Sequence, residues 1–209
     1  MCRTDGDLSQ SQPLLKRTSM KKTLLLIACT ALVSPLAFAQ AKNFEGFSLG
    51  ANIANTKTTF EDATTSIDGT TTGLDLNAQY NWALGQDFVL GVGVTMGTSN
   101  NKAGTSAANR DVTTKNRYAL EFTPGLAVSK DVLLYGKVAS LSGTAEIDGL
   151  GSEGISGVGY GLGVRGLVDK NLFWQVGYDL NQYAEKTSAT LGTYKAKSSI
   201  FSLGMGFKF

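Results

Sequence analysis

The chain has 209 residues, of which 19 are basic and 17 acidic; 42% are hydrophobic, 25 are glycine and none is histidine. Such a near-neutral balance lacks the basic footprint of nucleic-acid-binding proteins, so no nucleic-acid partner is expected. Because histidine is the most frequent general base and metal ligand, its absence also argues against a metal site and against most hydrolytic enzymes. The hydrophobic content is too high and the charge too low for a disordered chain.

An export signal lies near the amino terminus. Met20-Lys21-Lys22 is followed by an apolar run from Thr23 to Val33, and Ala37-Phe38-Ala39 forms a small-x-small cleavage site. This order of segments is typical of a secretory signal peptide. We therefore predict cleavage after Ala39, with Ala37 and Ala39 as the recognised residues.

This signal divides the chain into three parts. Residues 20–39 are the predicted signal peptide, and residues 40–209 are the predicted mature domain. Residues 1–19 carry mixed charges that suit no signal peptide, so translation is expected to start at Met20. Lipidation at Cys29 is the alternative, but the apolar run continues past Cys29, where a mature lipoprotein would become polar.

The mature chain alternates apolar and polar residues with a period of two. Between Leu74 and Trp82, for example, every second residue is apolar and every residue between them is polar. This alternation predicts β-strands with two different faces. In one segment Leu133, Leu134 and Tyr135 blur the pattern, and Lys137 assigns Leu134 to the apolar face. Eight strands are predicted, at residues 47–53, 74–82, 88–96, 118–126, 132–142, 158–164, 172–180 and 201–209.

The connections between these strands alternate strictly between short and long. Short turns are predicted at Leu84–Asp87, Ser129–Asp131 and Asp169–Asn171. Long polar loops are predicted at Lys57–Thr71, Ser99–Thr114, Gly143–Ser156 and Ala184–Ala196. All long loops therefore lie at one end of an up-and-down meander, an asymmetry typical of transmembrane barrels of the bacterial outer membrane.

The distribution of charge decides which face meets lipid. The apolar face is almost free of charged residues, whereas the other face carries several. A closed barrel with its apolar face in hydrocarbon satisfies every backbone group internally. We therefore predict an all-β fold, an eight-stranded antiparallel up-and-down transmembrane β-barrel that follows a cleaved signal peptide. The predicted network of charges in its lumen comprises Asp75, Arg117, Glu121, Lys137, Arg165 and Asp179.

Aromatic residues gather near the predicted strand ends, as in the interfacial girdles of membrane barrels. Trp82, Phe88 and Trp174 lie beside the short turns. Tyr118, Tyr160 and Tyr183 lie toward the long loops. These six residues are the predicted girdle.

Over the whole mature chain, the sequence resembles the small eight-stranded outer-membrane barrels related to the OmpX and OmpA-barrel families, the opacity-type porin group. The most specific residues are the alternating tail Leu203-Gly204-Met205-Gly206-Phe207-Lys208-Phe209. The resemblance implies that Leu203, Met205, Phe207 and Phe209 form the signal read by the outer-membrane assembly machinery. It further implies insertion in the outer membrane of a Gram-negative bacterium, in contact with lipid and lipopolysaccharide.

A structural or surface-exposed role, with an interior plugged by side chains, is the predicted function. An eight-stranded barrel is only wide enough for its own side chains. The alternatives are a narrow porin for small solutes or ions, and an adhesin that contacts a host or phage through the long loops.

Enzyme and cofactor chemistry are not expected. Without histidine no Ser–His chemistry is available, and the carboxylate pairs Glu61–Asp62 and Glu146–Asp148 fall in polar loops. The G-x-G-x-x-G stretch Gly161–Gly166 lies inside a predicted strand rather than before a helix, so no cofactor is expected there.

Overall fold

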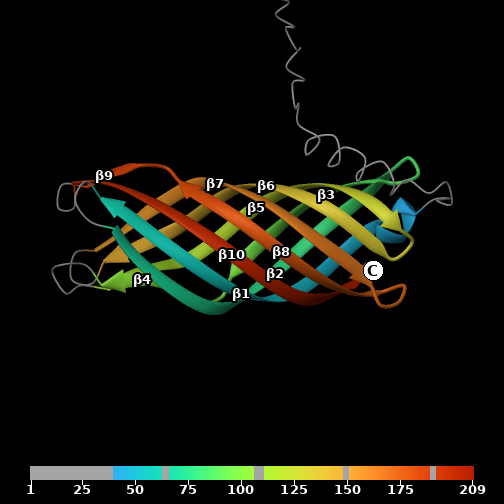
Figure 1. Cartoon of the computed structure of the whole chain (residues 1–209), viewed down its shortest axis with the longest axis horizontal. Coiled ribbons are helices and arrows are strands. Elements are labelled where there is room, and N and C mark those ends of the chain that lie inside the picture. The colour runs from blue at the N-terminus through green and yellow to red at the C-terminus, as the bar shows by residue number, and fades with distance from the viewer. Residues whose placement is uncertain (1–39, 63–65, 106–110, 148–150, 189–191) are drawn as a thin grey trace, which may run out of the picture. The chain divides into compact units, whose positions relative to one another are not determined.

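A computed structural model describes residues 40–62, 66–105, 111–147, 151–188 and 192–209. The predicted signal peptide, its cleavage residues Ala37 and Ala39, and the carboxylate of Asp148 lie outside these residues. A short 3-10 helix, η1 (Ala41–Phe44), precedes a single sheet (Figure 1). Its strands are β1 (Gly46–Asp62), β2 (Ser66–Leu84), β3 (Phe88–Gly97), β4 (Asn101–Thr105), β5 (Asp111–Ser129), β6 (Val132–Ile147), β7 (Gly151–Leu167), β8 (Leu172–Tyr183), β9 (Lys186–Ser188) and β10 (Gly192–Lys208).

The sheet closes on itself as an antiparallel barrel. Its wall runs in the order β1, β2, β3, β5, β6, β7, β8 and β10, and β10 returns to β1. The closing pairs run from Ser48 opposite Lys208 to Asp62 opposite Tyr194. The short strands β4 and β9 lengthen the wall by pairing with β5 and β10. The predicted eight-stranded up-and-down barrel is therefore confirmed.

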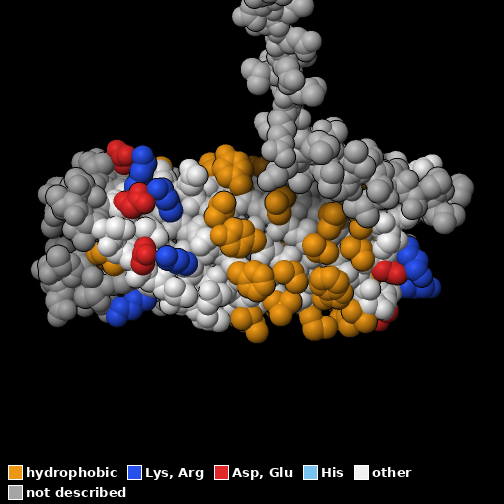
Figure 2. Space-filling view, in the orientation of Figure 1, with side chains coloured by type: hydrophobic (Ala, Val, Ile, Leu, Met, Phe, Trp, Pro, Cys, Tyr) orange, Lys and Arg blue, Asp and Glu red, His pale blue; other side chains and the backbone are white. Residues whose placement is uncertain are grey.

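The predicted sign of the two faces is also confirmed. On β6, Leu134 points outward and is 44% exposed, whereas its neighbour Leu133 points inward and is 3% exposed. Leu76, Val92 and Leu203 are likewise exposed on the outer wall. Figure 2 shows apolar side chains gathered as a band over the visible face of the barrel. No helix among the described residues is long and apolar enough to cross a membrane.

The four predicted long loops are mostly strand, which corrects the sequence analysis. Between Lys57 and Thr71, the ladder of β1 and β2 continues as far as the pair Glu61 and Ser66. The predicted loop at Gly143–Ser156 belongs mainly to β6 and β7, the one at Ser99–Thr114 to β4 and β5, and the one at Ala184–Ala196 to β9 and β10. Beyond the lipid the outward residues are polar, so the ladder continues without any apolar alternation to reveal it.

Ion pairs line the outside of these extended hairpins. Nζ of Lys197 lies 2.9 Å from Oε2 of Glu61, on the neighbouring strand. Figure 2 shows several such pairs beyond the end of the apolar band. Exposed pairs each contribute only about 0–1 kcal/mol, so the ladder rather than the charges holds the hairpins. Further pairs of this kind include Lys57–Asp68, Lys115–Glu146 and Lys195–Glu185.

The short turns lie where the sequence places them, and the turn between β7 and β8 is held by a carboxylate. Oδ1 of Asp169 accepts the backbone N–H groups of Asn171 at 2.8 Å and Leu172 at 2.6 Å. These two hydrogen bonds lower the pKa of Asp169 below its ordinary value. The amide of Asn171 in turn donates to the carbonyl of Lys208 at 2.7 Å, which ties the turn to the last strand.

The Asp169→Asn variant should be less stable than the parent at neutral pH, and the difference should shrink in acid. A carboxyl with a depressed pKa in the folded state stabilises that state above its unfolded pKa, and the contribution is lost as the pH falls through the folded value. Urea unfolding in detergent micelles, followed at neutral and at strongly acidic pH, measures this difference. Asp131→Asn, in another short turn, is the control; a deficit of Asp169→Asn that persists in acid would contradict the role of the charge.

Candidate functional site

The end of the barrel that carries the short turns is closed by η1, the segment just before β1. The N–H of Ala41 donates to the carbonyl of Gln86 at 2.9 Å, and the amide of Asn43 donates to the carbonyl of Lys130 at the same distance. From inside the barrel, the amide of Asn81 donates to the carbonyl of Phe44. The helix packs into a small apolar core made of Ala41, Phe44, Val89, Ala127 and Leu133. The sequence did not predict this plug, because Ala41 and Phe44 lie outside any strand and two apolar residues alone show no periodic pattern.

A layer of amides around Arg165 fills the barrel next to the plug. Arg165 Nη2 donates to the side-chain oxygens of Gln79 and Gln175, each at 2.9 Å. Its guanidinium carbon lies 4.4 Å from the centre of the Phe173 ring. Among the described residues no ion pair joins Arg165 to a carboxylate, so the structure separates Arg165 from the other members of the predicted charge network. Gln79, Gln175, Asn52, Asn77, Asn81 and Thr123 complete the layer through hydrogen bonds among themselves.

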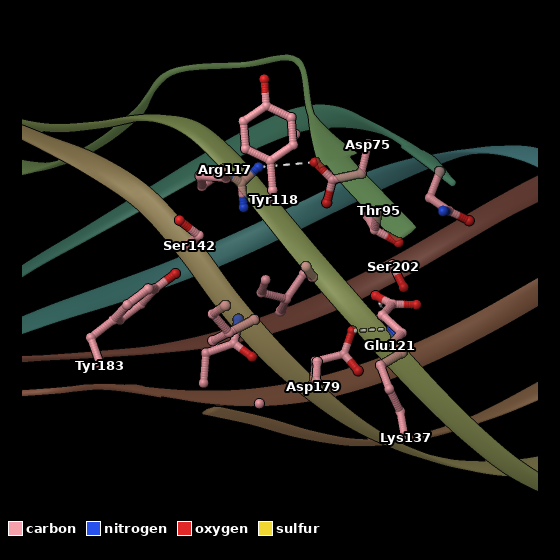
Figure 3. A pocket seen from close by; sticks show the side chains of 18 residues that line it. Asp75, Thr95, Arg117, Tyr118, Glu121, Lys137, Ser142, Asp179, Tyr183 and Ser202 are labelled. Atoms are coloured by element: carbon pink, nitrogen blue, oxygen red, sulfur yellow. Dashed lines mark hydrogen bonds and ion pairs between the residues drawn. The ribbon is translucent and has the colours of Figure 1, made fainter. Parts of the chain in front are cut away.

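The other five predicted charges come together in the next layer (Figure 3). Nζ of Lys137 lies 3.1 Å from Asp179 Oδ2 and 3.3 Å from Glu121 Oε1. Arg117 Nη2 donates to Asp75 Oδ1 at 2.9 Å. These five side chains are only 10–17% exposed. With Arg165, the six predicted residues are three cations and three anions, so these six charges balance.

Two of these pairs reach across an intervening strand, and a glycine makes each possible. Asp75 and Arg117 both lie opposite Gly97 in the ladder, and a Cβ on Gly97 would meet the Arg117 guanidinium. Lys137 and Asp179 both lie opposite Gly161, and a Cβ on Gly161 would meet Asp179 Oδ1. The inward glycines thus provide the space that the charged side chains occupy.

A small cavity lies within the charge layer. Its volume is about 70 Å³, enough for a few water molecules. Asp75, Arg117, Glu121, Lys137 and Asp179 line it, together with uncharged polar, aromatic and apolar side chains. Nε of Arg117 and Oδ1 of Asp179 are buried and have no hydrogen-bond partner among the described residues.

On the hairpin side of the charge layer, the inner face becomes apolar and threonine-rich. Tyr183 points into this part of the lumen (Figure 3), which corrects its predicted place in the outer girdle. On β8 the outward residues are even-numbered, from Leu172 to Leu180, so an odd-numbered tyrosine faces inward. The buried residues of this layer include Thr56, Thr114, Leu141, Ala145, Ile155, Ala196 and Ile200. Side chains therefore fill the lumen on both sides of the cavity.

The remaining predicted residues lie on the outer wall. Trp82, Phe88, Trp174, Tyr118 and Tyr160 are exposed there, and so are the tail residues Leu203, Met205, Phe207 and Phe209. The N–H of Phe209 donates to the carbonyl of Phe47 at 2.8 Å, so the chain end sits at the seam between β10 and β1. The use of this tail as an assembly signal stays a prediction.

The described residues offer no group of three or more Cys, Asp or Glu side chains placed to hold a metal ion. The G-x-G-x-x-G stretch Gly161–Gly166 lies within β7, and β8 follows it instead of a helix. A dinucleotide site needs such glycines at the start of a helix.

Comparison with known proteins finds one matching family and several similar solved structures. The sequence model of a family described as "Outer membrane protein beta-barrel domain" matches residues 24–209. No curated protein matches this chain. Among solved structures, Neisserial surface protein A is similar with a TM-score of 0.53 at 18% identity, over 79% of this chain and 98% of that one. Ail of Yersinia pestis, crystallised with the heparin analogue sucrose octasulfate, is similar with a TM-score of 0.51 at 17% identity, over 79% and 99% of the two chains. At these identities the likeness concerns the fold.

Proposed function

The chain belongs to the outer membrane protein β-barrel family of bacterial outer-membrane proteins, and from this premise we propose that it is a closed, non-conducting barrel whose working surface is its rim of extended hairpins. The observation that carries the proposal is the filled lumen. The apolar plug, the amide layer around Arg165, the charge layer and the threonine-rich layer follow one another along the axis. An enzymatic role is not proposed, because the chain lacks histidine.

The charge layer supports a plug rather than an ion path. Each buried cation there has a carboxylate within 3.3 Å. An ion that passed through would have to displace these pairs, and buried charges that lose a partner are costly. The cavity of about 70 Å³ is bordered by packed layers on both sides.

Planar-bilayer recording tests the closed lumen. The refolded protein should insert without stable conductance steps, and protease protection should verify insertion independently. Stable, reproducible steps from inserted protein would instead support the alternative, a narrow porin for small solutes or ions.

The extended hairpins beyond the lipid support a role in surface binding. Four hairpins continue past the apolar band, and four of their lysines, Lys57, Lys115, Lys195 and Lys197, are paired with carboxylates. A partner is therefore more readily recognised by hydrogen bonds to threonine, serine and asparagine than by net charge. The heparin analogue bound to Ail suggests sulfated sugars as one class of ligand to test. The other proposed contacts are a host surface, a phage and lipopolysaccharide. During insertion, the proposed partner is the assembly machinery.

Shortening one hairpin tests this role without opening the barrel. Lys57 and Thr70 are opposite each other in the ladder, so residues 58–69 can be replaced by an Asn-Gly turn that preserves the register. The variant should fold and insert normally but reduce adhesion of bacteria that display it. A second variant replaces residues 145–153, between the paired Thr144 and Gly154, in the same way and tests another hairpin. Unchanged adhesion in both variants would contradict a binding role for the hairpins.

A further inference from the structure

An apolar groove crosses the outer wall over β5, β6, β7 and β8. Its volume is about 600 Å³. It lies in the half of the apolar band near the short turns, since Gly136 closely follows the start of β6 at Val132. Its lining includes Pro124, Leu134, Gly136, Leu162, Val176 and Phe201.

The groove exists because two neighbouring residues of the outer wall fill little space. Gly136 on β6 has no side chain, and Pro124 on β5 has a short one. A Cβ placed on Gly136 would find Pro124 as its nearest neighbour, 3.9–4.0 Å away, so the space above this glycine is open. Gly166, another outward-facing glycine, is different, because the Trp174 ring already occupies the position of its Cβ. The ladder between β5 and β6 shows no pair at Pro124, which has no N–H to donate.

The surroundings decide what fills this groove. Leu134, Leu162 and Phe201 flank it and are exposed within the apolar band, so hydrocarbon is the solvent that reaches it. A dry apolar cavity of about 150 Å³ already holds benzene, so this groove has room for a much longer apolar chain. In lipid the gain comes from close packing, because an unfilled groove leaves its lining without contacts.

We propose that the groove binds one acyl chain of a phospholipid from the turn-side leaflet, as a resident lipid distinct from those that exchange freely around the barrel. The chain lies over Gly136 and Pro124, between the side chains of Leu134 and Leu162. The specificity is for a flexible, unbranched hydrocarbon, because the lining offers shape and almost no polar contact.

Native mass spectrometry of the protein extracted from membranes into detergent tests the proposal. At detergent concentrations that strip freely exchanging lipid, the parent protein should retain one phospholipid per barrel. Gly136→Leu, which fills the groove, should lose it. Ala78→Leu places the same side chain at an outward position on β2 and should retain the phospholipid.

Equal phospholipid on the Gly136→Leu and Ala78→Leu variants would overturn the proposal, because the lipid would then be non-specific. Dimers of the parent that Gly136→Leu converts to monomers would also overturn it, with a second barrel as the occupant. If Gly136→Leu fails to fold, judged by its heat-modifiable migration in electrophoresis, a second pair decides. Leu162→Ala removes a groove wall and should lose the lipid, whereas the equally outward Leu120→Ala should keep it; equal retention overturns the proposal.

Discussion

Replacement of Lys137 by methionine should lower the free energy of unfolding by about 3–5 kcal/mol, the usual cost of breaking a buried ion pair by removing one partner. Nζ of Lys137 is the cation shared by Asp179 and Glu121, at 3.1 and 3.3 Å. Methionine would leave both carboxylates facing each other in a narrow, largely water-excluded lumen. Urea unfolding in detergent micelles, followed by the fluorescence of Trp82 and Trp174, measures the loss.

Neutralising the partners should restore most of this stability. The triple variant Lys137→Met, Glu121→Gln, Asp179→Asn keeps nearly the same volumes but removes the unpaired charge, and neutral replacements of whole buried ion pairs are often tolerated. The surface control is Lys197→Met, which breaks the exposed pair with Glu61 and should cost about 0–1 kcal/mol. A loss for Lys137→Met no greater than that of the surface control would mean that the charge layer does not hold the interior together.

Much of the fold could be predicted because the membrane makes the sheet's two faces chemically different. Within the apolar band every outward residue meets hydrocarbon, so the alternation around Leu76 or Leu203 reveals both the strand and its orientation. The same alternation placed the charged residues of the lumen. One charge, Lys137, was enough to orient the ambiguous run from Leu133 to Tyr135.

Where water wets the outer face, this signal disappears. The strand extensions beyond the band, such as Lys57 to Asp62 on β1, read as loops because the exposed Lys57 and the buried, inward Thr58 are both polar. Tyr183 shows a different error. Its aromatic character suggested the interface, although its odd position on β8 already indicated the lumen.

The sequence could not predict which charged side chains pair inside the lumen, and the reason is geometric. Arg117 reaches Asp75 past a strand because Gly97 leaves the way open, and only the register of three strands places these residues in line. Arg165 looks like another member of the same network, but its register places it among glutamines. Periodicity assigns a residue to a face, whereas register decides its partner.

Replacement of Phe44 by alanine should open the turn-side end of the lumen while the barrel stays folded. Phe44 is 1% exposed and anchors the apolar plug, and truncation of a buried phenylalanine costs about 3–5 kcal/mol. Because η1 lies outside the closed ladder, this cost should appear as local opening of the plug instead of global unfolding. Opening should then become about a hundredfold more frequent or greater.

Thiol labelling measures the opening directly. The chain has two cysteines, Cys2 and Cys29, and with both replaced by serine a Thr123→Cys probe reports on the layer beneath the plug. A charged, water-soluble maleimide should label this probe slowly in the parent and much faster with Phe44→Ala. Lys42→Ala, an exposed change in the same helix, should leave the rate unchanged. Because no strand pairing involves η1, a folded Phe44→Ala barrel that still labels slowly would mean that the amide layer around Arg165 seals this end without the plug.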